Sequence, residues 1–242
     1  MAFTVFKQMY QEFNKCKNFE HPNIVKYKYF VRKHYKVLGD HEFHLLMEPL
    51  SWDMLKYIKY NSRAFHIDQA RNVGKNLVKA LQYLHDKKRV IHMDLKPQHI
   101  CFDRYVQKVK IINFGQSTYF SPLAPVTVSD EIDQRTIDKN TKAGGTFRYM
   151  SPEQLHGAIC PKIDIWAIGC IILYFITGME PYIGVPEEDV IDMICVRQIS
   201  PLDHLITTNI EKTDELIGYS QDLLTLLSDC FKFDHTKRPT AK

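Results

Sequence analysis

The stretch VIHMDLKPQHICF, residues 90–102, is the most informative segment of the 242-residue chain. It contains His92 and Asp94 in a His-x-Asp pattern, then Lys96 two residues later, and then His99. These are the residue types of a catalytic loop, with a histidine where a metal ligand would be useful. A lone His-x-Asp pattern carries little weight, so the neighbouring segments decide what this loop belongs to.

Four further motifs follow this stretch in order. KIINFGQS contains Asn113, Phe114 and Gly115, and GGTFRYMSPE is followed by DIWAIG and, near the end, by KRPT. In this order and spacing the five motifs resemble the eukaryotic protein kinase family, and the resemblance covers about residues 8–240. The DLKP sequence, together with Thr146 in GGTFRYMSPE, resembles the serine/threonine kinases rather than the tyrosine kinases.

The resemblance implies an α+β protein with the bilobal protein kinase fold, in one domain over residues 1–242. We expect an incomplete, β-rich small lobe in residues 1–48 and a mainly helical large lobe in residues 49–242, with an activation segment over residues 113–153. The family begins with a glycine-rich loop and a strand that carries an ATP-binding lysine, and neither pattern occurs in this sequence. The chain is therefore expected to be truncated at its start and clipped within its last helix.

Hydrophobic spacing predicts the elements of both lobes. Apolar residues recur at helical spacing in residues 3–19 and again in residues 69–85. The strand-like runs IVKYKYFV and EFHLLME flank a turn near residues 39–40, which indicates an antiparallel hairpin. HICF and KVKII are shorter strand-like runs, residues 118–143 resemble a polar, mobile loop, and the chain from Pro152 onward is mostly helical.

The resemblance also implies chemical roles. Phosphoryl transfer needs positioning and charge neutralisation, and Asp94 stands where the family orients the hydroxyl proton, with Lys96 as a contact to the transferred phosphate. The alternative for Asp94 is a structural carboxylate that caps the loop. ATP and Mg²⁺ are the implied cofactors. The implied nucleotide-binding positions are Met47, Glu48, Leu50 and Cys101, of which Met47 would guard the rear of the pocket or simply fill the core.

The two positions that hold magnesium in the family are changed, to His99 from asparagine and to Asn113 from aspartate. Magnesium prefers oxygen ligands in octahedral geometry, and Asn113 offers one oxygen without a charge. Two unit charges about 4 Å apart are worth about 4 kcal/mol at an effective dielectric of about 20, or roughly three decades of rate. The His99 nitrogen suits zinc or copper better, and its alternative role is a hydrogen bond that keeps the loop folded.

Two further departures concern regulation. Met93 replaces the arginine that, in the family, can receive a phosphate on the activation segment, so this route to activation is closed. Glu12 matches the helix glutamate that pairs with the ATP-binding lysine, and it has no evident partner in the sequence. The alternative for Glu12 is a solvated helix residue. The residues that fit the family's stacked apolar spine are His92, Phe114, Cys16 and Tyr27.

The supporting residues of the large lobe are retained. Glu153 and Arg238 resemble the family's buried ion pair, and Asp164 resembles the carboxylate that ties down the catalytic loop. The apolar run IDIWAIGCIILYFITG is interrupted by Asp164 and stops at Gly178, so it is too short to span a membrane and is typical of a buried helix.

Composition narrows the function classes further. The net charge of +4 fits ordinary solvated lysines better than nucleic-acid binding. The six cysteines lie far apart, without a C-x-x-C pair, which is typical of reduced thiols in the cytosol. No apolar signal core is present at the start of the sequence. We therefore expect a cytoplasmic protein that does not enter membranes.

Together these observations predict a domain of serine/threonine kinase ancestry that is catalytically impaired and acts as a pseudokinase-like module on a protein partner or substrate. The alternative is an active ATP-dependent serine/threonine kinase represented by an incomplete chain. A third reading is a structural remnant that binds no ligand.

Overall fold

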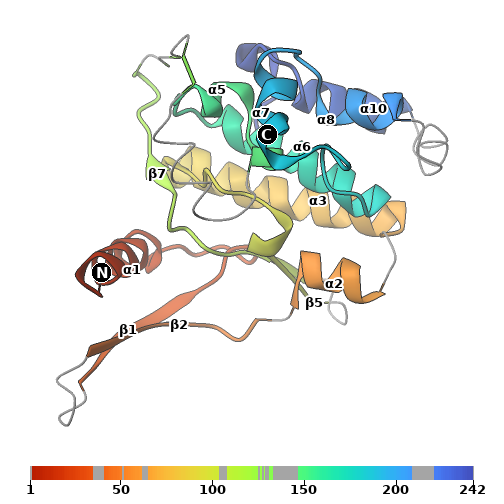
Figure 1. The fold of residues 1–242 in the computed structure, drawn as a ribbon. Helices are drawn as coiled ribbons and strands as arrows, with labels where there is room; N and C mark the ends of the chain where they lie inside the picture. The colour runs from red at the N-terminus through yellow and green to blue at the C-terminus, as the bar shows by residue number, and fades with distance from the viewer. Residues whose placement is uncertain are drawn as a thin grey trace.

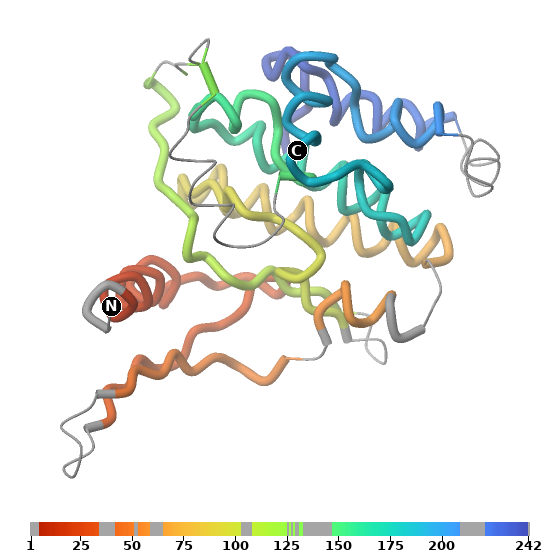
Figure 2. The backbone as a smooth tube through the Cα atoms, in the orientation of Figure 1, coloured from red at the N-terminus to blue at the C-terminus, as the bar shows by residue number. Residues whose placement is uncertain are grey.

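The computed structural model describes residues 2–34, 41–50, 52–61, 65–103, 108–124, 126, 128, 131–132, 147–208 and 221–241. A small unit with one helix and one hairpin lies beside a larger unit built mainly from helices (Figure 1). The tube in Figure 2 shows that residues 2–34 and 41–50 lie together, apart from the stacked helices of the C-terminal half.

The small unit consists of α1 (Ala2–Cys16) and an antiparallel hairpin, β1 (Tyr27–His34) and β2 (His41–Met47). The hairpin prediction is confirmed, whereas its turn lies outside the described residues. The helix was expected to reach residue 19 but ends at Cys16, where the Phe19 amide donates to the Cys16 carbonyl in a turn. The Phe6 ring packs 4.6 Å from that of Phe43 and 5.8 Å from that of Phe30, centroid to centroid, which attaches α1 to the hairpin.

The larger unit begins with short strands and helices, and its described elements after β7 are helical. Its short strands pair as β3–β5–β6 and as β4–β7, all antiparallel. In chain order its elements are β3 (Trp52–Asp53), α2 (Met54–Asn61), α3 (Ile67–Gln82), the π-helix η1 (Tyr83–Lys88), β4 (Val90–Ile91), the 3₁₀ turn η2 (Pro97–His99), β5 (Ile100–Asp103), β6 (Lys108–Ile111), β7 (Thr118–Tyr119), η3 (Phe147–Tyr149), α5 (Pro152–Leu155), α6 (Lys162–Thr177), α7 (Glu187–Cys195), α8 (Pro201–Thr207), α10 (Gln221–Cys230) and η4 (His235–Lys237).

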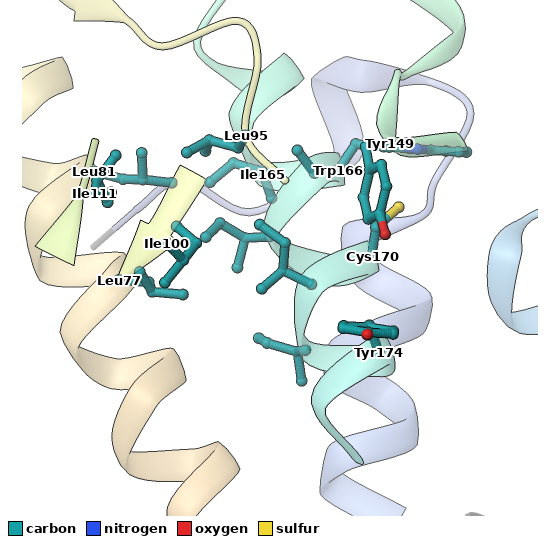
Figure 3. Close-up of a cluster of buried hydrophobic side chains, with 14 of the residues drawn as sticks. Leu77, Leu81, Leu95, Ile100, Ile111, Tyr149, Ile165, Trp166, Cys170 and Tyr174 are labelled. Atoms are coloured by element: carbon teal, nitrogen blue, oxygen red, sulfur yellow. The ribbon is translucent and has the colours of Figure 1, made fainter. Parts of the chain in front are cut away.

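The core lies between α3, α6 and the β5–β6 pair. Figure 3 shows Leu77 and Leu81 of α3 facing Ile100 and Ile111, with Ile165 of α6 on the opposite side. Every residue of α6 from Ile163 to Thr177 is buried, so its sequence carries no amphipathic stripe. Within the described residues no helix is long and apolar enough to span a membrane.

In the larger unit, two further expected elements differ from the structure. The helix expected over residues 69–85 is α3, which begins at Ile67 and continues as the π-helix to Lys88, where Arg89 ends it in a left-handed conformation. The loop expected from residue 118 begins with β7, because Thr118 and Tyr119 pair with Ile91 and Val90. Most of the remainder of that loop lies outside the described residues. The expected strands HICF and KVKII form the β5–β6 pair, with Ile100 opposite Ile111.

Candidate functional site

Asp164 of α6 holds the loop between β4 and η2 through hydrogen bonds. One carboxylate oxygen, Oδ2, accepts hydrogen bonds from His85 Nε2 at 2.8 Å and from the His92 amide at 2.9 Å, and Oδ1 accepts from the Met93 amide at 3.0 Å. Complete burial opposes the charged form of Asp164, but the His85 hydrogen bond and the nearby histidines outweigh it and lower the pKa of Asp164 below its usual value. Asp164 is therefore a charged anchor for the loop.

Met93 adopts an unusual backbone conformation within this loop. Its φ is 67°, in the left-handed region that a non-glycine residue enters at a cost of about 1–2 kcal/mol. Asp164 accepts from its amide, and Gln154 Nε2 donates to its carbonyl at 2.7 Å. Since both sides of the residue are fixed by buried groups, the surrounding structure maintains the strained conformation.

His92 joins the loop to the Asn113–Phe114–Gly115 turn. Its Nε2 donates to the Ile112 carbonyl at 3.1 Å, while Nδ1 accepts from the Asp94 amide at 3.3 Å. Its ring lies 4.9 Å from that of Phe114, and the Phe114 ring is 6.4 Å from that of Tyr27. Burial lowers the pKa of His92, with Asp164 acting in the opposite direction, so this histidine is a neutral packing residue.

The Asp94 and Lys96 side chains lie next to each other in the loop. The Lys96 Nζ is 3.3 Å from Asp94 Oδ1, and both side chains are mostly buried. The contact has ion-pair distance but lacks hydrogen-bond geometry, and Asp94 Oδ1 accepts no hydrogen bond from the described residues. A carboxylate and an ammonium group in this arrangement are suited to orient a hydroxyl next to a phosphate.

His99 and Asn113 are bonded to each other. His99 Nδ1 donates to the Asp94 carbonyl at 2.7 Å, so His99 Nε2 is left as an acceptor, and Asn113 Nδ2 donates to it at 2.8 Å. Asn113 Oδ1 in turn accepts from the Gly115 amide at 3.4 Å, which agrees with this orientation of the amide. Burial lowers the pKa of His99 to about 4, with Asp94 opposing the shift, so the imidazole is neutral.

This arrangement does not fit magnesium. The ligands available are an imidazole nitrogen and an amide whose NH₂ group faces that nitrogen, whereas magnesium requires several oxygen ligands, usually with carboxylate charge. In the described part of the chain no group of three or more His, Cys, Asp or Glu side chains is placed to hold a metal ion. The His99 alternative named from sequence, a hydrogen bond that keeps the loop folded, matches the observed contacts.

Glu12 is not an unpartnered, solvated residue, and that expectation is wrong. Its Oε1 accepts from the Tyr27 hydroxyl at 2.5 Å and from the Phe114 amide at 2.9 Å. One turn further along α1, the Lys15 ammonium donates to the carbonyl and to the hydroxyl of Ser117. The helix is thus bonded to the turn after β6 at two points.

The expected nucleotide-binding residues lie on separate elements. Met47 ends β2 and is 36% exposed, Leu50 packs against the core, and Cys101 is buried in β5 opposite Asp53. Glu48 Oε1 accepts from the Lys26 amide at 2.7 Å and lies 2.8 Å from Lys110 Nζ. Partial burial opposes ionisation of Glu48, but these contacts lower its pKa, so it serves as a surface ion-pair partner. Among the described residues, no hydrogen bond or ion pair joins any of these four side chains to Asp94.

Glu153 and Arg238 form the ion pair expected from their motifs. The guanidinium NH1 and NH2 lie 2.5 and 2.8 Å from the two carboxylate oxygens, and both side chains are buried. Arg238 also donates from Nε to the Lys232 carbonyl at 2.7 Å and stacks 5.0 Å above the Trp166 ring. The bidentate geometry and the additional donors compensate for burying both charges.

Sequence patterns did not single out several residues that hold the site. His85 and Gln154 act on the loop from buried positions, and Lys15 follows Glu12 by three residues, the helical spacing that could have indicated a shared face. Arg148, in the GGTFRYMSPE motif, does not contact this loop through its described hydrogen bonds and ion pair. Its guanidinium instead donates to the carbonyls of Pro181, Tyr182 and Val185 and pairs with Glu187 at 2.7 Å.

Comparison with known proteins identifies the class. The family model described as "Protein kinase domain" matches residues 3–242. The chain therefore belongs to the eukaryotic protein kinase family, and its two units are the small and large lobes of the bilobal α+β kinase fold.

Its relatives include several serine/threonine kinases. It is 28% identical over 193 residues to Calcium-dependent protein kinase 4 of Plasmodium falciparum, covering 78% of this chain and 32% of that protein. It is 29% identical to the SNF-related serine/threonine-protein kinase of Rattus norvegicus, covering 80% and 24%. It is 26% identical to the Cyclin-dependent kinase 4 homolog of Caenorhabditis elegans, covering 92% and 54%. The chain thus spans about a third of the first of these relatives and about half of the last.

Proposed function

We propose that this kinase domain, of serine/threonine kinase ancestry, is impaired in phosphoryl transfer and acts as a pseudokinase-like module that binds a protein partner. The observation that carries the proposal is the hydrogen bond between His99 and Asn113. The two bonded residues stand at both positions at which the family holds magnesium. At one of them the neutral amide of Asn113 replaces a carboxylate. ATP and Mg²⁺ are used by the family in general, and we propose that this chain handles the metal poorly.

The energetic argument rests on charge. Removing one negative charge from direct contact with a divalent ion costs about 4 kcal/mol or more at an effective dielectric of about 20. Occupying the site would also require breaking the His99–Asn113 bond and leaving a buried imidazole nitrogen without its donor, a further cost of about 1–3 kcal/mol. The charge loss by itself corresponds to about three orders of magnitude in affinity or rate, and the lost hydrogen bond to roughly five- to 160-fold.

A binding role is supported by the condition of the scaffold. Asp164 still holds the loop, and the Glu153–Arg238 pair is fully formed. A stable two-lobed domain can present a surface to a partner without turning over ATP. In the proposed organisation the small lobe covers residues 1–48, the large lobe residues 49–242, and the activation segment residues 113–153. The described cysteines are free, which supports a reducing, cytoplasmic location.

The experiment compares nucleotide binding and phosphate transfer in four proteins: the natural chain, Asn113→Asp, His99→Asn and the double variant. Titration calorimetry measures ATP affinity with and without millimolar magnesium. The natural chain should bind weakly with less than a tenfold response to magnesium, and the double variant should gain a response. Transfer of labelled phosphate to the chain itself or to a generic protein substrate, above the background of an Asp94→Asn control, would overturn the proposed impairment.

A second candidate, an active serine/threonine kinase, is favoured by one specific observation. Asp94 Oδ1 accepts no hydrogen bond from the described residues, and Lys96 lies within ion-pair distance of it, as a hydroxyl-orienting pair requires. For this candidate, phosphate transfer should exceed the Asp94→Asn background, and Lys96→Ala should reduce it. If neither ATP binding nor transfer is detected, the third reading, a structural remnant that binds no ligand, is favoured over both.

A further inference from the structure

The strongest unassigned feature of the molecule is the contact between α1 and the Asn113–Phe114–Gly115 turn. Glu12 accepts two hydrogen bonds through the same oxygen, from the Tyr27 hydroxyl and from the Phe114 amide. Within the described residues Glu12 forms no ion pair with a lysine or arginine. We infer that Tyr27 is the positioning residue for Glu12, and that Glu12 and Lys15 together clamp the turn in one conformation without help from a nucleotide.

Tyr27 is placed for this task at the first position of β1. It is 3% exposed, and its ring packs edge-on against Phe114 while its hydroxyl reaches Glu12. Burial and the Glu12 charge raise the pKa of Tyr27 far above its usual value, so the phenol keeps its proton and donates. A hydrogen bond from a hydroxyl to a carboxylate is one of the stronger kinds in proteins.

Lys15 supplies the second contact of the clamp. Residues 12 and 15 lie on the same face of α1, since they are three positions apart in a helix. Lys15 Nζ donates to the Ser117 hydroxyl oxygen at 2.9 Å, and that hydroxyl donates to the Phe114 carbonyl at 2.6 Å. Both polar groups of the Phe114 backbone are therefore fixed, the amide by Glu12 and the carbonyl by Ser117.

The clamp acts on the neighbouring residue Asn113. A Cβ added at Gly115 would meet Glu12 Oε2 at 3.5 Å and Asn113 Oδ1 at 3.4 Å, so the helix, the turn and the amide side chain are in close contact. Asn113 has a left-handed φ of 62° and directs its amide at His99. Holding Phe114 therefore holds the His99–Asn113 bond. This inference goes beyond the proposed function and does not depend on whether phosphate transfer is impaired.

Hydrogen exchange of the 242-residue chain, read by mass spectrometry, tests the clamp. Tyr27→Phe removes only the hydroxyl, and Tyr29→Phe is its control, because Tyr29 is on the same strand but 64% exposed. Tyr27→Phe should speed exchange of the Phe114 amide and its neighbours by about ten- to a hundredfold. Tyr29→Phe should leave it unchanged, and α6 should exchange alike in all proteins.

A double-variant comparison separates the clamp from simple packing. In a Glu12→Ala background, Tyr27→Phe should have no further effect on the turn, because its acceptor is already gone. Unchanged exchange in Tyr27→Phe, full additivity with Glu12→Ala, or equal acceleration in the turn and in α6 would each overturn the inference. This experiment does not measure phosphate transfer. A negative result would therefore overturn the clamp and leave the proposed impairment of phosphoryl transfer untouched.

Discussion

The loop at residues 92–99 has two supports that differ in charge, Asp164 of α6 and the His99–Asn113 pair. On the side that faces α6, the buried carboxylate of Asp164 is surrounded by three donors, and elsewhere in the large lobe the buried Glu153 is paired with Arg238. His99 and Asn113 form a neutral pair. The fold depends on the buried charges, because a buried charge without its partners is costly, whereas the His99–Asn113 pair contains no charge that has to be compensated. We propose that the scaffold therefore keeps its fold although the two metal positions are changed.

The largest effect on stability is expected from the buried ion pair of the large lobe. Arg238→Ala leaves Glu153 buried without its partner and should lower the free energy of unfolding by about 3–5 kcal/mol. For a chain of this length that is a fall in melting temperature of roughly 6–20 °C. Lys237→Ala is a matched control, because the Lys237 side chain is exposed and forms a surface ion pair with Asp234. Equal melting temperatures for both variants would show that the buried pair does not support the fold.

Acid should weaken the contribution of His99 to stability. The pKa of His99 is lowered to about 4, below its unfolded value of about 6.5, so the unfolded chain takes up this proton before the folded one does. The stability from neutral His99 is fully present above about pH 6.5 and is lost as the pH falls toward 4, at up to about 1.4 kcal/mol per pH unit. The titratable groups that act on the pKa of His99 are Asp94, His92 and Lys96.

Denaturant unfolding at several pH values measures this slope. His99→Asn lacks the titrating group, and its stability should vary less between pH 6.5 and 4 than that of the natural chain. Parallel curves for the two proteins would mean that His99 is not held neutral by the contacts described.

Smaller effects are expected at Asn113, where two variants separate backbone from side chain. Asn113→Gly keeps the left-handed φ and loses the bond to His99, which should cost about 1 kcal/mol. Asn113→Ala loses the same bond and adds the strain of a left-handed alanine, about 1 kcal/mol more. Urea unfolding of both variants gives the difference. An alanine variant as stable as the glycine variant would show that the turn relaxes its backbone.

Sequence patterns were sufficient where a residue acts through a local motif. The β1–β2 hairpin is predicted by local spacing. The two-lobe fold and the Glu153–Arg238 pair, whose members lie 85 positions apart, are predicted because each residue belongs to a short motif that resembles the kinase family. Sequence patterns were insufficient for Glu12, because its partners are a tyrosine hydroxyl 15 positions away and a backbone amide 102 positions away. A backbone amide carries no residue type, so no sequence pattern marks such a partner.

The same limit applies to the changed metal positions. The sequence indicates that His99 and Asn113 depart from the family pattern. Predicting the hydrogen bond between them also requires the tautomer of His99, and the Asp94 carbonyl sets that tautomer in the folded structure. The roles of Asp94, Lys96 and the four nucleotide-binding positions stay predictions, since the contacts described show where they lie and not what they bind.

The most direct test of the central claim is the response of ATP affinity to magnesium in the natural chain. Titration calorimetry at matched ionic strength, with and without millimolar magnesium, gives the ratio of the two dissociation constants. We expect weak or undetectable binding and a ratio below ten, because the His99–Asn113 pair offers the ion no charged oxygen. A tenfold or greater gain in affinity on adding magnesium would contradict it.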